Sequence, residues 1–358
     1  MVFASLPRSD QRRKGRDYLH GLLSTPGRKS VRRIAAQIGG SGTGQSLHHF
    51  ICSSTWDWTP VRRALAQHVM HAARPRAWVV RPLPISKSDR RPAGAGHDPA
   101  YAGHDPAGAD GFRTAQRAVG VWLASESASV PVDWHLHLPE GEAGGTLADR
   151  AADACLALRS EWDLPARPIV MDLRDSHPVG ALRRMRAAGT HPVARVSPEL
   201  ELTVTDPALT GHVGRVLMAA DIMRAARALR RPVGEHGGPA RGRALRPGRR
   251  PELVAAVGVG SPGAAFALVG IGPSAMDWPG ELWLTTLPPE QAAAGVAPVR
   301  GLLRTTELAQ YAIGDHVGIR DYAGRSFSGW HRHITLASTA HAAAALARSD
   351  DRPGERHT

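Results

Sequence analysis

Between residues 77 and 196, short apolar runs alternate with segments of helical character, and this alternation constrains the fold most. The apolar runs predict strands over residues 77–80, 118–124, 132–138, 168–171 and 192–196. Helices are expected over residues 148–160 and 178–188. Strands that alternate with helices in this way predict an α/β layer with parallel strands.

Asp172 stands directly after one of these apolar runs, in the sequence PIVMD. Open α/β sheets place their sites at the carboxyl ends of strands, so Asp172 is the best single candidate for a metal-binding acid. Phosphoryl transfer to nucleic acids commonly uses two divalent ions held by several carboxylates. Glu307, on a helix expected over residues 301–313, is a second candidate. Taken singly, each acid is more often a surface or capping residue.

The charge balance of the chain favours an anionic partner. Its 358 residues contain 45 Lys+Arg and 32 Asp+Glu, for a formal net charge of +13. Nearly all the cations are arginines, whose planar guanidinium groups suit phosphate. With 42% hydrophobic and 22% charged residues, the composition excludes a wholly disordered chain. Nucleic acid is favoured over a membrane, because no strong basic amphipathic anchor is evident.

The cysteines and the N-terminus indicate the compartment. Cys52 and Cys155 lie far apart without a CxxC pattern, which favours a reducing environment. Basic residues come early at the N-terminus, before an apolar core of signal-peptide length. No apolar stretch approaches the ~20 residues of a membrane helix. We therefore expect a cytoplasmic, nucleoid-associated protein without a membrane partner.

Residues 1–75 are expected to form a basic helical region. Ser30 can cap a helix whose apolar side chains follow the helical repeat, and Thr59-Pro60 opens another after a glycine-containing turn. This outline is that of a helix-turn-helix unit, but also of a small helical bundle with a solvated basic face. If the region binds DNA, the candidate contacts are Arg28, Lys29, Arg32, Arg33, His48 and His49.

Two further segments leave alternatives open. The sequence AGHDPA occurs at residues 95–100 and 102–107, and its His-Asp pairs could chelate a metal or belong to a low-complexity loop. The segment from Arg224 to Arg250 holds nine arginines and one acid. This arginine-rich segment could bind a phosphate backbone or form a surface loop.

Sequence blocks spread over most of the chain together resemble those of a known protein family. They comprise residues 21–40, 45–50, 56–66, 77–80, 116–125, 130–140, 167–172, 281–288 and 317–338. In this order and spacing, the blocks resemble the DDE-type bacterial insertion-sequence transposases, specifically the insertion sequence 701 family. The resemblance implies an α/β fold. It has an RNase H-like core, an N-terminal helical (helix-turn-helix-like) DNA-binding region and an insertion before the last acidic helix. In this chain, the N-terminal region corresponds to residues 1–75 and the first part of the core to residues 76–200. The insertion corresponds to residues 201–300, and the last core helix with the C-terminal helical block to residues 301–358.

The resemblance also implies a chemistry. Family members cleave double-stranded DNA at transposon ends and join the strands to a target, with Mg²⁺ or Mn²⁺ held by three acids. The second acid corresponds to Asp172, and the third, eleven residues before Gly318, corresponds to Glu307. A homodimer is a further expectation.

The position of the first acid departs from the family pattern. It should follow the run AWVV, but this chain has Arg81 there, and Asp89 is a distant substitute. The basic residues that the family tends to have around the third acid are Leu303 and Gly314 here. Loss of one carboxylate removes a ligand, and we expect weak or absent strand-transfer activity from such a degenerate active site.

The C-terminal block offers a second set of candidate DNA contacts. Arg325, Trp330, His331 and Arg332 combine basic and planar groups that could contact phosphates or stack on bases. Alternatively, Phe327 and Trp330 anchor the last helix, expected over residues 328–347, and the histidines are simply exposed.

Three interpretations therefore remain at this stage. The chain is an insertion-sequence transposase or its degenerate descendant, a non-catalytic DNA-binding protein or regulator derived from one, or an unrelated α/β protein. In the third case, the positive charge would merely reflect base composition.

Overall fold

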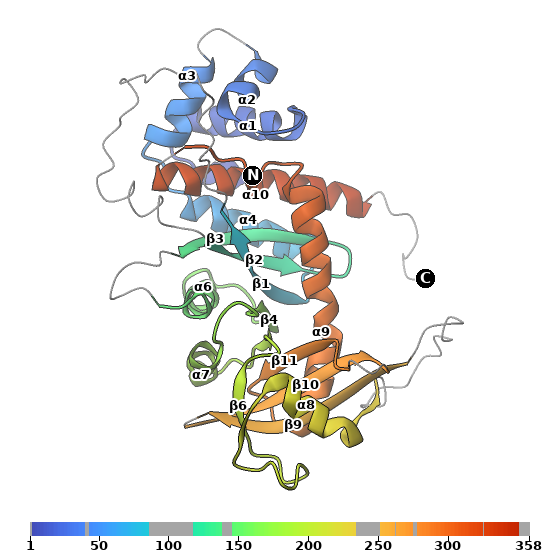
Figure 1. Ribbon diagram of the computed structural model, residues 1–358. Helices are drawn as coiled ribbons and strands as arrows, with labels where there is room; N and C mark the ends of the chain where they lie inside the picture. Colours follow the sequence, from blue (N-terminus) through green and yellow to red (C-terminus); the bar gives the residue numbers. More distant parts are fainter. Residues whose placement is uncertain are drawn as a thin grey trace, which may run out of the picture.

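The computed structural model describes residues 2–39, 43–85, 117–137, 145–233, 251–261, 263–274, 278–324 and 326–350 (Figure 1). The two AGHDPA repeats, Asp89, Arg325 and most of the arginine-rich segment, from residue 234 to 250, lie outside these residues. Within the described part of the chain, the strands join into one eleven-stranded sheet of order β3-β2-β1-β4-β5-β11-β10-β9-β6-β7, and β8 pairs with β9.

The first half of this sheet contains the strands that the sequence predicts. It consists of β1 (Ala77–Pro84), β2 (Arg117–Ala124), β3 (Ser129–His137), β4 (Ile169–Asp172) and β5 (Val193–Arg195). The helices α6 (Leu147–Glu161) and α7 (Val179–Ala187) accompany it. Parallel pairing is confined to β1–β4 and β4–β5, whereas β1, β2 and β3 are antiparallel. The strands β1, β2 and β4 are almost entirely buried, which explains their continuous apolar runs.

Residues 200–300 are more regular than their sequence indicates. They form β6 (Glu201–Val204), β7 (Val216–Met218), α8 (Ala219–Ala225), the 3₁₀ turn η4 (Ala226–Leu229), β8 (Arg231–Pro232), β9 (Glu252–Ser261), β10 (Ala264–Pro273) and β11 (Glu281–Thr285). The hairpin β9–β10 continues the sheet, because β11 pairs with both β10 and β5. Glycines within β9 and β10 weaken the strand signal in the sequence.

Helix α9 (Pro289–Ala309) begins twelve residues before the helix expected over residues 301–313, and a π-helical turn η5 (Gln310–Gly314) follows it. Pro289 occupies its first turn, and Pro298 lies inside it. Because an internal proline is typical of a helix boundary, the sequence conceals the first half of α9. The helix packs against both halves of the sheet, from β9 and β10 to β1 and β3 (Figure 1).

The N-terminal helices and the last helix form one layer (Figure 1). The N-terminal elements are η1 (Val2–Ser5), α1 (Ser9–Ser24), α2 (Val31–Ile38), α3 (Thr43–His48), the π-helical η2 (His49–Ser53) and α4 (Thr59–Ala72). The last helix, α10 (Phe327–Asp350), contacts α1, η2, α4 and β3. As the sequence predicts, the side chain of Ser30 caps α2 by accepting a hydrogen bond from the backbone N–H of Arg33.

Gly318 holds the turn before α10 against the N-terminal helices. Its φ of +73° suits glycine, and a Cβ atom there would lie only 2.4 Å from the Cγ of Lys29. The Gly318 carbonyl oxygen also forms a 2.8 Å hydrogen bond with Nε2 of His333. The first and last parts of the sequence are therefore packed against each other in the interior.

No helix in the described ranges is both long enough and apolar enough to span a membrane.

Candidate functional site

Arg81, within β1, and Asp172, the last residue of β4, lie side by side on two neighbouring interior strands of the sheet. Strands β1 and β4 are parallel, and Val80 pairs with Met171, so the next residue of each strand is Arg81 and Asp172. The Nη2 atom of Arg81 is 3.8 Å from Oδ2 of Asp172 and 3.2 Å from Oε1 of Glu307, which α9 brings to the same place. The structure thus brings together the three residues that the sequence singles out, with the guanidinium between the two carboxylates.

Arg174 completes this site, and the sequence analysis did not single it out. Its Nε and Nη2 atoms donate to the two carboxylate oxygens of Asp172, both at 2.8 Å. Burial would raise the pKa of Asp172, but the Arg174 hydrogen bonds and the charges of Arg174 and Arg81 together hold it below its ordinary value. The only sequence signal is an arginine two residues after the aspartate, within MDLRD.

The hydrogen bonding of Arg81 is incomplete. The side chain is only 6% exposed, and its Nε and Nη1 atoms have no hydrogen-bond partner among the residues that the structure describes. Buried donors without partners each cost about 1–3 kcal/mol. Glu307 is different, because 36% of its side chain is exposed and water can solvate the carboxylate. The site therefore holds a cation whose surroundings satisfy only part of its hydrogen-bonding capacity.

The comparison with known families concerns the part of the chain that contains Arg81 and Asp172. A family described as DDE superfamily endonuclease matches residues 1–216 of the 358. The chain belongs to the DDE superfamily of endonucleases. The matched part ends before α9, so Glu307 lies outside it. No curated protein matches the sequence. The mixed α/β sheet is consistent with a nuclease core of this superfamily, and membership excludes the interpretation as an unrelated α/β protein.

Nucleases of the DDE superfamily generally use divalent metal ions, and the present site does not fit one. Magnesium prefers several free carboxylate oxygens. Here both oxygens of Asp172 accept hydrogen bonds from Arg174, and Glu307 accepts one from Arg81. The two guanidinium groups therefore occupy carboxylate oxygens that a divalent ion would need, and their positive charges oppose a cation. Among the described residues, no three His, Cys, Asp or Glu side chains form a group that could hold a metal.

The predicted DNA contacts of this DDE superfamily chain divide into exposed and buried residues. Arg28, Arg32, Arg33 and His49 are exposed, and His48 is half-buried. Lys29 is buried: its backbone N–H donates to Asp321 at 2.7 Å, and its ammonium group donates to the carbonyl oxygen of Thr25. Burial lowers the pKa of Lys29. The prediction that Lys29 contacts DNA is therefore wrong, because its side chain is buried and its ammonium group is bound to the Thr25 carbonyl oxygen.

The predictions for Trp330, His331 and Arg332 are wrong for the same reason. All three residues belong to α10, and their side chains are buried in the protein. Arg332 donates to the carbonyl oxygens of Ile51 and Trp56, both at 3.1 Å. Trp330 helps to anchor the helix, as the alternative proposed, but His331 is not exposed as that alternative required.

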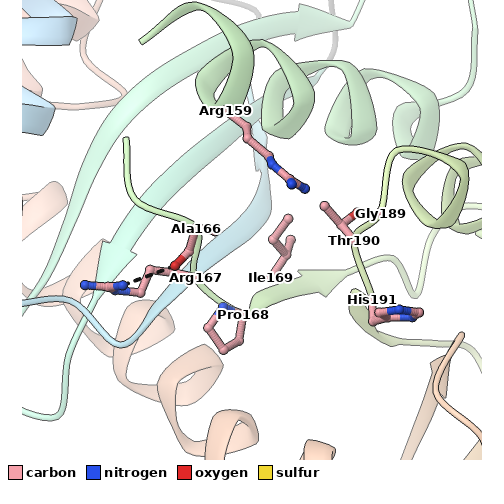
Figure 2. A pocket seen from close by; sticks show the side chains of 8 residues that line it. All are labelled: Arg159, Ala166, Arg167, Pro168, Ile169, Gly189, Thr190 and His191. Atoms are coloured by element: carbon pink, nitrogen blue, oxygen red, sulfur yellow. Dashed lines mark hydrogen bonds between the residues drawn. The ribbon is translucent and has the colours of Figure 1, made fainter. Parts of the chain in front are cut away.

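A pocket lies at the opposite end of β4 from Asp172 (Figure 2). Its described lining residues include Arg159, Arg167 and His191 but no carboxylate. Arg159 points towards Thr190, whereas Arg167 donates to the carbonyl oxygens of Ala166 at 3.1 Å and of Pro75 at 3.0 Å. Several donors are thus committed to the backbone. The pocket is separate from the site formed by Arg81, Asp172 and Glu307.

Proposed function

We propose that this DDE superfamily member is a transposase-like DNA-binding protein of the insertion sequence 701 type, in which Arg81 disables strand cleavage. The observation that carries the proposal is the position of the Arg81 guanidinium between Asp172 and Glu307. In this proposal, these two acids are remnants of a catalytic triad that held Mg²⁺ or Mn²⁺. A divalent ion is repelled by the guanidinium and lacks the third carboxylate.

The order of the strands supports the finer assignment of the fold. The run β3-β2-β1-β4-β5, with β2 antiparallel to β1 and β4 parallel to it, is that expected of an RNase H-like core. Residues 201–300 correspond to the insertion before the last acidic helix, and α2 and α3 correspond to the helix-turn-helix-like part. Residues 1–75 would then bind duplex DNA, although α10 packs them onto the core.

A strand-cleavage assay tests the disabled site. We expect the unaltered protein to leave duplexes with candidate terminal repeats intact in Mn²⁺ or Mg²⁺, because its two acids are neutralised by Arg81 and Arg174. The variant Arg81→Asp changes the local charge by two units and supplies the third carboxylate. We expect it to nick the same DNA in Mn²⁺, and Mn²⁺ to raise its melting temperature, since a ligand that binds the native state stabilises it.

The matched control is Arg63→Asp, which makes the same charge change at an exposed position of α4. It should acquire neither nicking nor stabilisation by Mn²⁺. Efficient metal-dependent cleavage and joining by the unaltered chain would overturn the proposal of a disabled site. If Mn²⁺ does not change the melting temperature of a folded Arg81→Asp variant, the assignment of position 81 to the lost acid is refuted.

The second candidate function is a non-catalytic DNA-binding regulator. The exposed group Arg28, Arg32 and Arg33 favours it, because this group does not depend on the Arg81 site. Binding of duplex DNA should weaken steeply with salt, and replacing one phosphate-contacting arginine should reduce the slope of log K against log salt by about 1. For both candidate functions, we also propose that the protein is a homodimer and is located in the cytoplasm at the nucleoid.

A further inference from the structure

An exposed apolar pair lies beside the candidate site on α9 and η5. Leu308 directly follows Glu307 and is 61% exposed, and Tyr311 is 51% exposed. Arg304, Leu308 and Tyr311 follow the i, i+4, i+7 spacing, so they share one exposed face. The opposite face of the helix is buried against the protein and includes Thr306 and Gln310. The exposed pair is therefore not part of the core.

A cation already covers part of the Tyr311 ring. The guanidinium carbon of Arg320 lies 5.0 Å from the ring centre, a distance typical of a cation–π contact. Arg320 Nε is also 3.6 Å from Oδ1 of Asp315, which helps to hold the guanidinium in place. Arg304 adds a second, exposed cation on the same side of the helix. An apolar and aromatic surface is thus flanked by positive charge, which suits a planar group attached to a phosphate.

The size of the surface favours a nucleobase over a protein partner. Stable protein interfaces bury ~800 Å² on each side, much more than two side chains provide. The other exposed large hydrophobic side chains in the described part of the chain are Val213, Val216 and Met218, in the distant segment around β7. A base stacked on one aromatic side chain needs no wider surface and gains about 1–3 kcal/mol.

We propose that the surface formed by Leu308 and Tyr311 stacks an unpaired nucleobase of a DNA strand end, with Arg304 and Arg320 facing the adjoining phosphates. Bases inside a duplex are covered by their neighbours, so only a splayed or single-stranded end can present a face to Tyr311. The surface therefore selects unpaired ends. This inference rests on the proposed function as a DNA-binding protein.

The test compares three fluorescein-labelled DNAs by anisotropy: a blunt duplex, the same duplex with a three-nucleotide overhang, and the single strand. We expect Tyr311→Ala to weaken binding of the overhang and the single strand about 5- to 150-fold, the range equivalent to 1–3 kcal/mol, with blunt-duplex affinity unchanged. Tyr311→Phe retains the ring and should bind like the unaltered protein. Leu308→Ala should weaken the same two DNAs to a smaller extent.

A 2-aminopurine in the overhang provides a direct measure of stacking, because its fluorescence should be quenched by the unaltered protein but not by Tyr311→Ala. Val216→Ala, another exposed apolar residue, is the control and should change nothing. Unchanged affinity and quenching in Tyr311→Ala, or equal weakening for all three DNAs, overturns this inference. Failure of the unaltered chain to bind any of the DNAs instead refutes the proposed function.

Discussion

Arg62 and Arg81 are both buried arginines paired with carboxylates, but their surroundings differ. Nε and Nη1 of Arg62 donate to the Thr335 hydroxyl at 2.7 Å and to Asp133 at 2.9 Å, and Nη2 contacts Nδ1 of His331 at 3.0 Å. Within the described part of the chain, Arg81 makes one hydrogen bond, to Glu307, and its Nε and Nη1 atoms have no partner. Among the described residues, the hydrogen-bonding capacity of Arg62 is therefore met more completely than that of Arg81.

The Arg62 network joins three parts of the chain. Arg62 comes from α4, Asp133 from β3 and His331 from α10. Burial would raise the pKa of Asp133, but His135 and Arg62 outweigh this and lower it to about 2. The ring of His331 stacks on Trp58 at 4.6 Å. A buried ion pair with complete hydrogen bonding fixes how these elements meet, and its loss should affect the whole layer.

The largest expected effect is that of Arg62→Met. The variant leaves Asp133 buried without its guanidinium partner, and removal of one member of a buried pair typically costs about 3–5 kcal/mol. Chemical denaturation monitored by circular dichroism would measure the loss in the free energy of unfolding. A loss below about 1 kcal/mol would show that this network is no more important to the fold than a surface ion pair.

Acid should destabilise the layer around α10. Burial lowers the pKa of His341 to about 4, from an ordinary value of about 6.5. Between these values the unfolded chain binds a proton that the native chain does not, so stability falls as the pH drops from about 6.5 to about 4. The loss from His341 alone is roughly 3 kcal/mol. Burial also lowers the pKa of His331 and His333, which adds to the effect.

Unfolding in urea at several pH values between 4 and 7 measures this dependence. The variant His341→Leu removes one titrating group and should flatten the curve in that window. The Arg81 site contributes little there, because the pKa of Asp172 lies below its ordinary value and the carboxylate stays ionised. A stability profile that is flat from pH 7 to pH 4 would contradict the assignment of these histidines as buried and neutral.

The smallest expected effect is that of Arg81→Met, the matched partner of Arg62→Met. Asp172 keeps its two hydrogen bonds from Arg174, and Glu307 is partly solvated, so neither carboxylate is left buried and uncompensated. The two donors without partners also disappear. We expect the free energy of unfolding to change by less than about 1 kcal/mol, in either direction. A loss as large as that of Arg62→Met would make Arg81 a structural residue and remove the contrast between the two sites.

Much of the core and the position of the site could be predicted from local sequence. The continuous apolar runs at residues 77–80 and 168–171 give β1 and β4, because burial on both faces requires them. The end of β4 then defines the position of Asp172, whereas Arg81 lies inside β1, which continues to Pro84 beyond the predicted run. Residues 200–300 were not predictable in the same way, because glycine-rich β9 and β10 acquire their order from pairing with each other and with β11.

The sequence by itself determined the basic character of the chain, the alternation of its elements, and the position of Asp172 at the end of a strand. Only the tertiary structure decided which cations are buried. Arg332 lies inside because the carbonyl oxygens of Ile51 and Trp56, nearly three hundred residues earlier, are turned towards it. A charge can be buried only where distant groups supply its hydrogen bonds, and such groups leave no local pattern in the sequence.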